Sequence, residues 1–259
     1  MLKRSAEKYS ATYEEIKQRL STGNLIHAYE THVSVKGKDS YVWVFTSMED
    51  VIYLWSETRE GHNATDFLKE FKGVLVSDFY SGYDAVDCPQ QRCLIHLMRD
   101  LNDDIHQEPF NREIKQIVQE FATLLKPIID TIDRFGLKSR FLRKHKLAVT
   151  RFYNALFCRK YNTELAGKAQ ERFKKNRTRL FTFLDYDNVP WNSNNAEHAI
   201  KSFAALRNVI EGTTKENTIV DYLILLNIYQ TCTYRGIDFL TFLRSGERRI
   251  DGCVGKPGH

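Results

Sequence analysis

The first third of the chain alternates short apolar runs with turn residues, a pattern typical of β-strands. The segment 36–39 (KGKD) reads as a tight turn, and a short polar link follows the second run. Short links of this kind predict an antiparallel meander. The three predicted strands are residues 25–35, 41–46 and 51–55.

The spacing of apolar residues changes after the third strand. Residues 63–71 have helical spacing, 73–78 (GVLVSD) form a short apolar run that ends in an acid, and 80–86 read as a short helix or turn. Residues 92–95 (RCLI) predict one more strand, with a helix from residue 96 onward. This β-α-β-α alternation predicts that the added strands are parallel to one another.

The remainder of the chain predicts helices. Apolar residues recur at intervals of three and four from 114 to 132, and Pro127 is expected to kink or divide that helix. Residues 246–259 are polar and are expected to fray. The further predicted helices are 137–161, 164–184, 195–207, 217–234 and 237–243.

This order of elements predicts an α/β protein with the ribonuclease-H-like fold. We expect a mixed five-stranded sheet, a helical insertion and C-terminal helices. The corresponding regions are 1–104 for the first part of the core, 105–185 for a basic helical insertion, and 186–259 for the closing helices and a tail.

Composition excludes several classes of protein. Hydrophobic residues make up 42% of the 259, enough for a sizeable core, so a disordered chain is excluded. No apolar run is long enough to span a bilayer, and no signal peptide follows the charged start. Five widely spaced cysteines indicate reduced thiols in a cytoplasmic protein.

Positive charge is concentrated in the middle of the chain. The net charge is +5, but residues 105–185 hold 18 Lys and Arg against 8 Asp and Glu. Such a segment suggests a surface that contacts phosphates. Solvated basic faces of helices would give the same composition, so both interpretations stay open.

Asp78 follows the run of residues 73–77 directly. Groups at the carboxyl ends of strands in open α/β sheets face the ligand crevice, and a carboxylate there suits a hard cation such as Mg²⁺. Equally, Asp78 could cap the turn formed by residues 79–82. The sequence does not separate the two roles.

Glu197 lies where a helix is predicted to begin, three residues after Asn194. That spacing is typical of a capping box, in which the glutamate binds a backbone N–H. A carboxylate in the first turn is also stabilised by the helix dipole, which makes it a ready metal ligand. Elsewhere, Cys93 and His96 have a metal-like spacing, but a closed zinc site needs four ligands and no second pair stands nearby, so packing is the favoured role.

Several segments together resemble the catalytic domain of bacterial D-D-E transposases of the insertion-sequence 66 family. The similarity runs from about residue 24 to residue 244 and includes Arg207 and Gly212. The segments that carry it are Ala28–Thr31 (AYET), Gly73–Tyr83 (GVLVSDFYSGY), Cys93–Asp100 (CLIHLMRD) and Pro190–Ile200 (PWNSNNAEHAI).

This resemblance implies metal-dependent cleavage of DNA strands and strand transfer during transposition of an insertion element. Asp78 matches the second acid of the family motif and Glu197 the third, and these acids hold two ions of Mg²⁺ or Mn²⁺. Lys201 and Arg207, on the same predicted helix as Glu197, are candidates to hold DNA phosphates; solvated helix charges remain the competing interpretation. A homo-oligomer or other element-encoded proteins are further expected partners, and no membrane is implied.

The chain departs from the family motif at its first acid, where Tyr29 stands in place of Asp. A phenol with a pKa of about 10 is neutral at pH 7 and is a poor ligand for Mg²⁺. Glu30 is adjacent, but on a strand it should point to the opposite face. We therefore expect the nuclease activity of this chain to be impaired.

A second departure lies upstream of the first strand. Apart from a helix at residues 13–20, the DNA-binding region that the resemblance implies is expected to be missing. Two other functions remain: a non-catalytic nucleic-acid-binding remnant that keeps the fold, and a helical module whose basic face binds an acidic protein.

Overall fold

The described part of the protein divides into two compact units. The computed structural model describes residues 2–210 and 216–253, with the backbone but not the side chains of 205–210, 216–217 and 253. Residues 1–88 together with 193–259 form one unit, here the core unit, and Pro89–Asn192 form the other, here the helical unit. The region boundaries expected from the sequence, after residues 104 and 185, stay a prediction.

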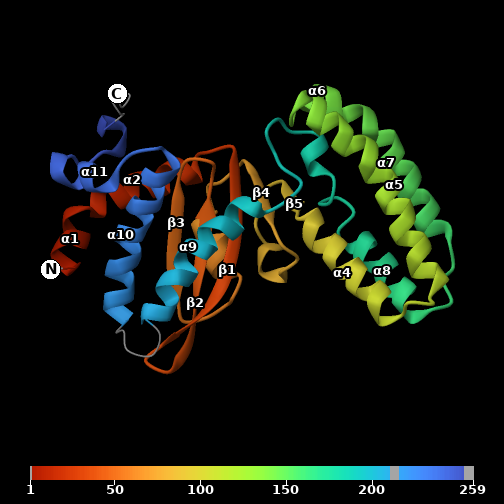
Figure 1. Cartoon of the computed structure of the whole chain (residues 1–259), viewed down its shortest axis with the longest axis horizontal. Helices are drawn as coiled ribbons and strands as arrows, with labels where there is room; N and C mark the ends of the chain where they lie inside the picture. The colour runs from red at the N-terminus through yellow and green to blue at the C-terminus, as the bar shows by residue number, and fades with distance from the viewer. Residues whose placement is uncertain (1, 211–215, 254–259) are drawn as a thin grey trace. The chain divides into compact units, whose positions relative to one another are not determined.

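A mixed sheet of five strands, in the order β3-β2-β1-β4-β5, confirms the α/β class (Figure 1). β1 pairs with β2 and β2 with β3 in antiparallel fashion, so the predicted meander is confirmed. β4 pairs with β1 in parallel. The strands are β1 (Leu25–Val35), β2 (Lys38–Thr46), β3 (Val51–Ser56), β4 (Val74–Ser77) and β5 (Gln90–Arg92).

The turn between β1 and β2 explains their tight pairing. Lys36 and Gly37 both have positive φ angles, 52° and 75°. Two successive residues with positive φ are characteristic of the type I′ turn, whose twist matches that of an antiparallel hairpin. The glycine removes the steric cost at the second of these positions.

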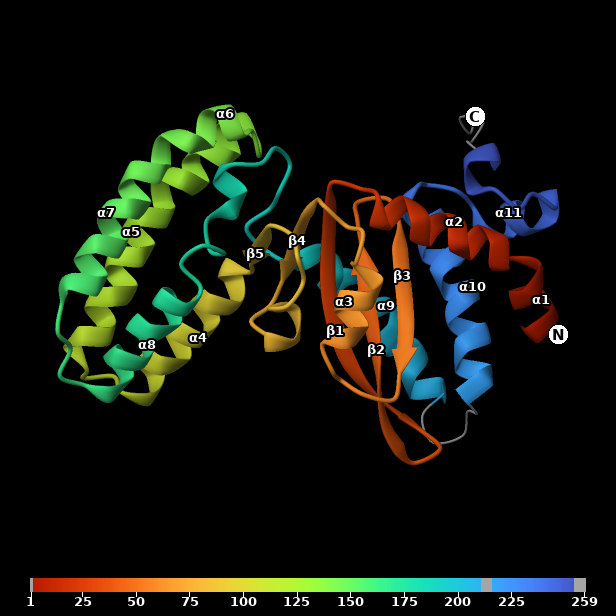
Figure 2. The same cartoon turned by 180° about the vertical axis from the view of Figure 1, so that it is seen from behind.

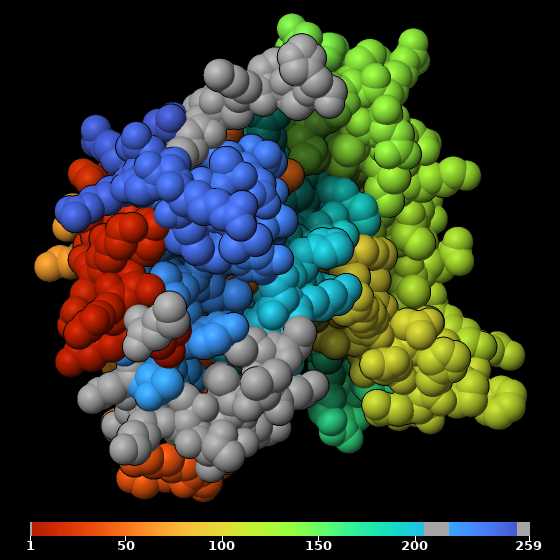
Figure 3. Space-filling view, turned by 60° about the vertical axis from the view of Figure 1, so that its left-hand side comes forward, coloured from red at the N-terminus to blue at the C-terminus, as the bar shows by residue number. Residues whose placement is uncertain are grey.

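Helices cover both faces of the sheet in the core unit. α9 packs on β1 and β2, and α3 lies on the opposite face, where the Phe67 ring stacks 4.2 Å from Phe45 (Figures 1 and 2). α1 packs against α10, as the red and blue surfaces of Figure 3 show. The helices are α1 (Leu2–Lys8), α2 (Ser10–Ser21), α3 (His62–Phe67), α9 (Asn194–Ile210), α10 (Glu216–Tyr234) and α11 (Phe239–Ser245), with short 3₁₀ turns η1 (Ser81–Tyr83) and η4 (Ile250–Cys253).

The helical unit is built around aromatic side chains. The ring of Phe121 lies 5.9 Å from that of Phe152 and 5.1 Å from that of Phe173, which joins three helices. The helices are α4 (Leu94–Gln107), α5 (Arg112–Phe135), α6 (Ser139–Leu142), α7 (Lys146–Cys158) and α8 (Glu164–Lys175), with 3₁₀ turns η2 (Arg143–His145) and η3 (Thr182–Leu184).

Two boundaries predicted in this unit are wrong. The strand expected at 92–95 ends at Arg92, and α4 begins at Leu94, because Leu94, Leu97 and Leu101 are spaced to bury one helix face. The helix expected over 164–184 ends at Lys175. Asn176 follows it and its side chain donates to the carbonyl of Arg172, a local bond that competes with continued helix.

Pro127 does not divide its helix, because α5 runs unbroken from Arg112 to Phe135. Proline leaves the carbonyl four residues earlier, at Thr123, without its helical donor. Both Pro127 and Thr123 are exposed, so water can satisfy that carbonyl. The buried face of the helix, which includes Phe121 and Leu125, offsets the remaining cost of about 3 kcal/mol.

Four cysteines of the described chain, at positions 88, 93, 158 and 232, form no disulfide with one another. None of the helices described is long and apolar enough to cross a membrane.

A buried ion cluster ties the N- and C-terminal helices to the sheet. Asp50, whose side chain is 6% exposed, accepts hydrogen bonds from Arg19 at 3.0 and 3.1 Å and from Arg235 at 3.1 Å. Asp251 pairs with both arginines, and Glu15 pairs with Arg19 at 3.0 Å. α2, α10 and the turn before β3 are therefore held by one carboxylate.

His27 is an unpaired polar group within β1. It is 1% exposed, and neither ring nitrogen has a hydrogen-bond partner among the described residues. Burial lowers the pKa of the His27 imidazole from 6.5 to about 4, since the charged form loses its hydration. The folded protein therefore holds this side chain neutral at pH 7.

We expect His27 to make the protein less stable in acid. Its pKa is depressed on folding, so its stabilising contribution is full above pH 6.5 and is lost as the pH falls through about 4. The loss between pH 7 and pH 4 is about 3 kcal/mol. Urea unfolding at both pH values measures it, and His27→Leu, which removes the titrating group, is the comparison. An equal loss in both proteins would contradict the assignment.

Candidate functional site

Tyr29 and Asp78 both lie just beyond the paired part of β1 and β4. The last pair of the parallel register is His27 with Val76; Tyr29 follows two residues further along β1, Asp78 directly follows β4, and the charge of Asp78 acts on the Tyr29 phenol. Side chains two residues apart on a strand share a face, so Tyr29 lies on the same face as His27 and Val33. Val33 packs with Ala199 and Phe203 of α9, which identifies the α9 side of the sheet.

Glu197 reaches this face from the first turn of α9. Its helix is fixed to the sheet two residues later, where the Tyr53 hydroxyl donates to the Ala199 carbonyl at 2.8 Å. At the start of the helix, the Asn195 side chain donates to the Ser47 carbonyl. Both bonds come from the meander strands and their turns, so the position of Glu197 depends on the tertiary structure.

The carboxylate of Glu197 is not used as a helix cap. α9 begins at Asn194, which puts Glu197 one residue too far along for a capping box. Its Oε1 atom is buried and has no hydrogen-bond partner among the described residues. Leaving a buried carboxylate oxygen unsatisfied costs free energy, and a bound cation would remove that cost.

Three carboxylates act on the phenol of Tyr29. Burial, followed by the negative charges of Asp78, Glu30 and Glu197, raises the pKa of Tyr29 above its usual 10.0, although Arg59 opposes the shift. Tyr29 is therefore neutral at pH 7. The fold thus brings Asp78 and Glu197, 119 positions apart in sequence, close enough to one side chain to perturb its ionisation.

Asp78 serves the turn that follows it, as one interpretation of the sequence expected. Its Oδ1 accepts a hydrogen bond from the backbone N–H of Tyr80 at 2.9 Å. This bond fixes the direction of the carboxylate. It is compatible with metal binding, since a carboxylate has two oxygens and each can accept more than one partner.

Glu30 lies on the other face of the sheet, as expected for the neighbour of Tyr29. Its Oε1 accepts hydrogen bonds from Arg59 Nη2 at 2.6 Å and Nε at 3.1 Å, and its Oε2 accepts one from the Tyr83 hydroxyl at 2.6 Å. Burial raises the pKa of Glu30, these hydrogen bonds lower it, and the charge of Asp78 raises it further, with a net upward shift. Glu30 is thus engaged by two partners and does not join the carboxylates on the face of Tyr29.

Of the two basic candidates on α9, Lys201 is exposed to solvent. The side chain of Arg207 lies outside the described residues, as does Gly212. Within the described chain, no group of three or more His, Cys, Asp and Glu side chains is placed to hold a metal ion.

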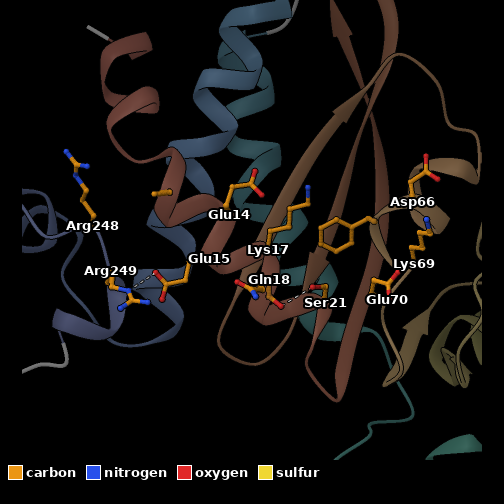
Figure 4. Close-up of a pocket in the computed structure, with 12 residues that line it drawn as sticks. Glu14, Glu15, Lys17, Gln18, Ser21, Asp66, Lys69, Glu70, Arg248 and Arg249 are labelled. Atoms are coloured by element: carbon orange, nitrogen blue, oxygen red, sulfur yellow. Dashed lines mark hydrogen bonds and ion pairs between the residues drawn. The ribbon is translucent and has the colours of Figure 1, made fainter.

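We call Asp78 and Glu197, together with Tyr29, the acidic site. It is distinct from a concavity of about 770 Å³ elsewhere in the core unit (Figure 4). That concavity is bordered by α2, α3 and Arg248 and Arg249 of the C-terminal segment. Acidic and basic side chains alternate around it, and none of Tyr29, Asp78 or Glu197 contributes to it. Its mixed charge gives no preference for a cation or an anion.

Comparison with known proteins adds to this geometry. The sequence profile of a family described as "Transposase IS66 family" matches residues 1–219. The chain belongs to this family. The match begins at residue 1, earlier than the expected 24, and ends at 219 rather than 244. No curated protein matches the chain.

Transposases of this kind generally use a divalent metal ion. In this chain, some of the residues at the acidic site are suitable ligands for such an ion and one is not. Asp78 and Glu197 offer hard carboxylate oxygens, the donors that Mg²⁺ and Mn²⁺ prefer. The buried, unpartnered Oε1 of Glu197 is the observation that favours a cation. The neutral phenol of Tyr29 adds no negative charge to this set.

One charged residue of this transposase beside the site was not singled out from the sequence. Arg59, which follows β3, pairs with Glu30 and is near enough to Asp78 for that charge to raise the pKa of the guanidinium. A basic residue in the loop after β3 was the only sequence signal. The pairing of that strand end with the turn after β4 could not be read from the pattern.

Proposed function

We propose that this protein is the catalytic region of a transposase, with a ribonuclease-H-like fold and a site for DNA strand cleavage and strand transfer at Asp78 and Glu197. In this chain the activity is impaired, because Tyr29 takes the position of the first carboxylate. The supporting observation is that the charges of Asp78 and Glu197 both act on the phenol of Tyr29.

Bound Mg²⁺ or Mn²⁺ supplies Lewis-acid stabilisation of the attacking and leaving oxygens in an in-line phosphoryl displacement. The residues that would hold it are Asp78 and Glu197. The backbone N–H of Tyr80 orients the carboxylate of Asp78, and the hydrogen bonds that fix α9 to the sheet position Glu197. Tyr29, neutral at pH 7, leaves the set one carboxylate short.

DNA is the proposed substrate, both as element ends and as target. Lys201 and Arg207 are proposed to hold phosphates, and the basic segment 105–185 to contact the backbone more widely. A second copy of this chain or other proteins of the same element are the further partners proposed. A cytoplasmic location remains a prediction.

A second function is favoured by the side chain at position 29. If Tyr29 abolishes metal binding, the protein is a non-catalytic nucleic-acid-binding remnant of a transposase that keeps the fold. The two functions differ in whether the wild-type chain binds a divalent ion at the acidic site.

We expect Asp78→Asn and Glu197→Gln each to weaken Mn²⁺ binding by tenfold or more, on the order seen when metal-site residues are altered. Titration with Mn²⁺, followed by its electron paramagnetic resonance signal, measures the affinity. Asp66→Asn is the matched control, since Asp66 borders the separate concavity of mixed charge. Equal Mn²⁺ affinity in all four folded proteins would refute the proposed site.

A further inference from the structure

Arg59 is held in a fixed position beside the acidic site. Its guanidinium binds Glu30 Oε1 through Nη2 and Nε, and its Cζ atom lies 4.3 Å from the centre of the Tyr80 ring. The Tyr80 hydroxyl donates in turn to the Arg59 carbonyl. Glu30 and Tyr80 thus hold the guanidinium of Arg59, and Tyr80 also holds its backbone carbonyl.

The loops that carry these residues are in direct backbone contact. A Cβ atom placed on Gly61 would lie 2.6 Å from the carbonyl oxygen of Gly82, so the two loops approach each other too closely for a side chain at position 61. The same stretch after β4 begins with Asp78, whose Oδ1 binds the Tyr80 N–H. Arg59 and Asp78 are therefore positioned by a shared element, the turn at Tyr80.

The ion pair with Glu30 leaves much of the guanidinium available. Glu30 is 2% exposed, whereas the side chain of Arg59 is 49% exposed. Among the backbone and side-chain atoms that the structure describes, Nη1 of Arg59 has no hydrogen-bond partner, and only two of the guanidinium N–H groups are used. If Arg59 served only to neutralise Glu30, its remaining N–H groups would not need to face solvent.

The geometry points to Arg59 as a phosphate-binding residue, which takes a backbone phosphate of DNA next to the phosphate at Asp78 and Glu197. This inference rests on the proposed function, since it assumes that DNA lies across the acidic site. The planar fork of an arginine suits the oxygens of a phosphate, and pre-ordering by Glu30 and Tyr80 lowers the entropy lost on binding. Glu30, next to the impaired ligand position, is then the residue that orients Arg59.

The salt dependence of DNA binding tests this role. Each phosphate that the protein ceases to neutralise makes the slope of log affinity against log salt concentration less steep by about 0.9. We expect this change for Arg59→Gln on a random-sequence duplex, and no change for Arg59→Lys, which keeps the charge. Arg249→Gln is the matched control, because that exposed arginine pairs with Glu15 and not with a group of the site.

Arg59→Gln also leaves Glu30 buried without its cation, so the double variant Arg59→Gln with Glu30→Gln separates binding from folding. If Arg59 binds phosphate, the double variant keeps the reduced slope. If Arg59 only neutralises Glu30, the double variant regains the wild-type slope, and the inference is overturned.

A wild-type slope in Arg59→Gln itself also overturns the inference, even where the metal site proves correct. Absence of DNA binding by the wild type at low salt overturns it together with the proposed substrate. A reduced slope with no Mn²⁺ binding at Asp78 and Glu197 instead supports Arg59 and contradicts only the catalytic part of the proposed function.

Discussion

Replacing Tyr29 by aspartate is expected to give the protein a metal-dependent DNA strand cleavage that the unmodified chain lacks. Position 29 lies two residues beyond the last β1–β4 pair, and the charges of Asp78 and Glu197 both act on it. An aspartate there adds a third carboxylate to a set that already has two. Nicking of supercoiled plasmid DNA in Mg²⁺ or Mn²⁺ measures the gain.

Stability in the presence and absence of metal gives an independent measure of the same substitution. Without metal, a third carboxylate is repelled by Asp78 and Glu197, so the melting temperature of Tyr29→Asp should fall below that of the wild type. Metal at about one hundred times its dissociation constant should then stabilise the variant by about 2.7 kcal/mol. The wild type, with fewer ligands, should respond less.

Two substitutions at the same position serve as controls. Tyr29→Phe removes only the hydroxyl, and Tyr29→Asn has the shape of aspartate without its charge, so neither should gain cleavage. A folded Tyr29→Asp variant with neither cleavage nor tighter metal binding would show that position 29 is not part of a metal site.

Removal of the Asp50 carboxylate should cause the largest loss of stability among the substitutions considered. Asp50→Ala leaves Arg19 and Arg235 close together without the buried carboxylate that they share, and only the more exposed Asp251 still pairs with both. Breaking a buried pair in this way costs about 3–5 kcal/mol. Urea unfolding at pH 7 measures the difference in the free energy of unfolding.

Asp39→Ala is the matched control for Asp50→Ala. Asp39 also has a close polar partner, His32 Nε2 at 2.7 Å, but the Asp39 side chain is 84% exposed. Exposed pairs contribute between 0 and about 1 kcal/mol, so the loss should be small. Equal losses in the two variants would mean that the Asp50 cluster does not hold the terminal helices to the sheet.

The strands of the core unit were predictable because each local signal agreed with the tertiary structure. The segment 25–35, in which β-branched and apolar residues mix with polar ones, became β1 with the same ends, and of the turn predicted at 36–39, residues 36 and 37 have the positive φ angles of the turn while β2 begins at Lys38. Prediction failed where packing overrode a local signal. The apolar run at 92–95 predicted a strand, yet α4 begins at Leu94, whose side chain is buried with Leu97 and Leu101 on one face of that helix.

The acidic site was only partly predictable. Asp78 and Glu197 were recognised as candidates, and the placement of Glu30 away from Tyr29 followed from the alternation of a strand. The link between Glu30 and Arg59 was not predictable, because it depends on where the loop after β3 meets the turn after β4. No periodicity in the sequence encodes a contact between two irregular segments.

By itself, the sequence determined the antiparallel meander and the helical character of the middle of the chain. These follow from interactions between near neighbours, namely side-chain alternation and turn conformation. Only the tertiary structure decided that Asp78 and Glu197 act on one phenol and that Glu30 is held by Arg59 and Tyr83. Those facts depend on a parallel strand register and on the packing of α9, which bring together residues that no local rule relates.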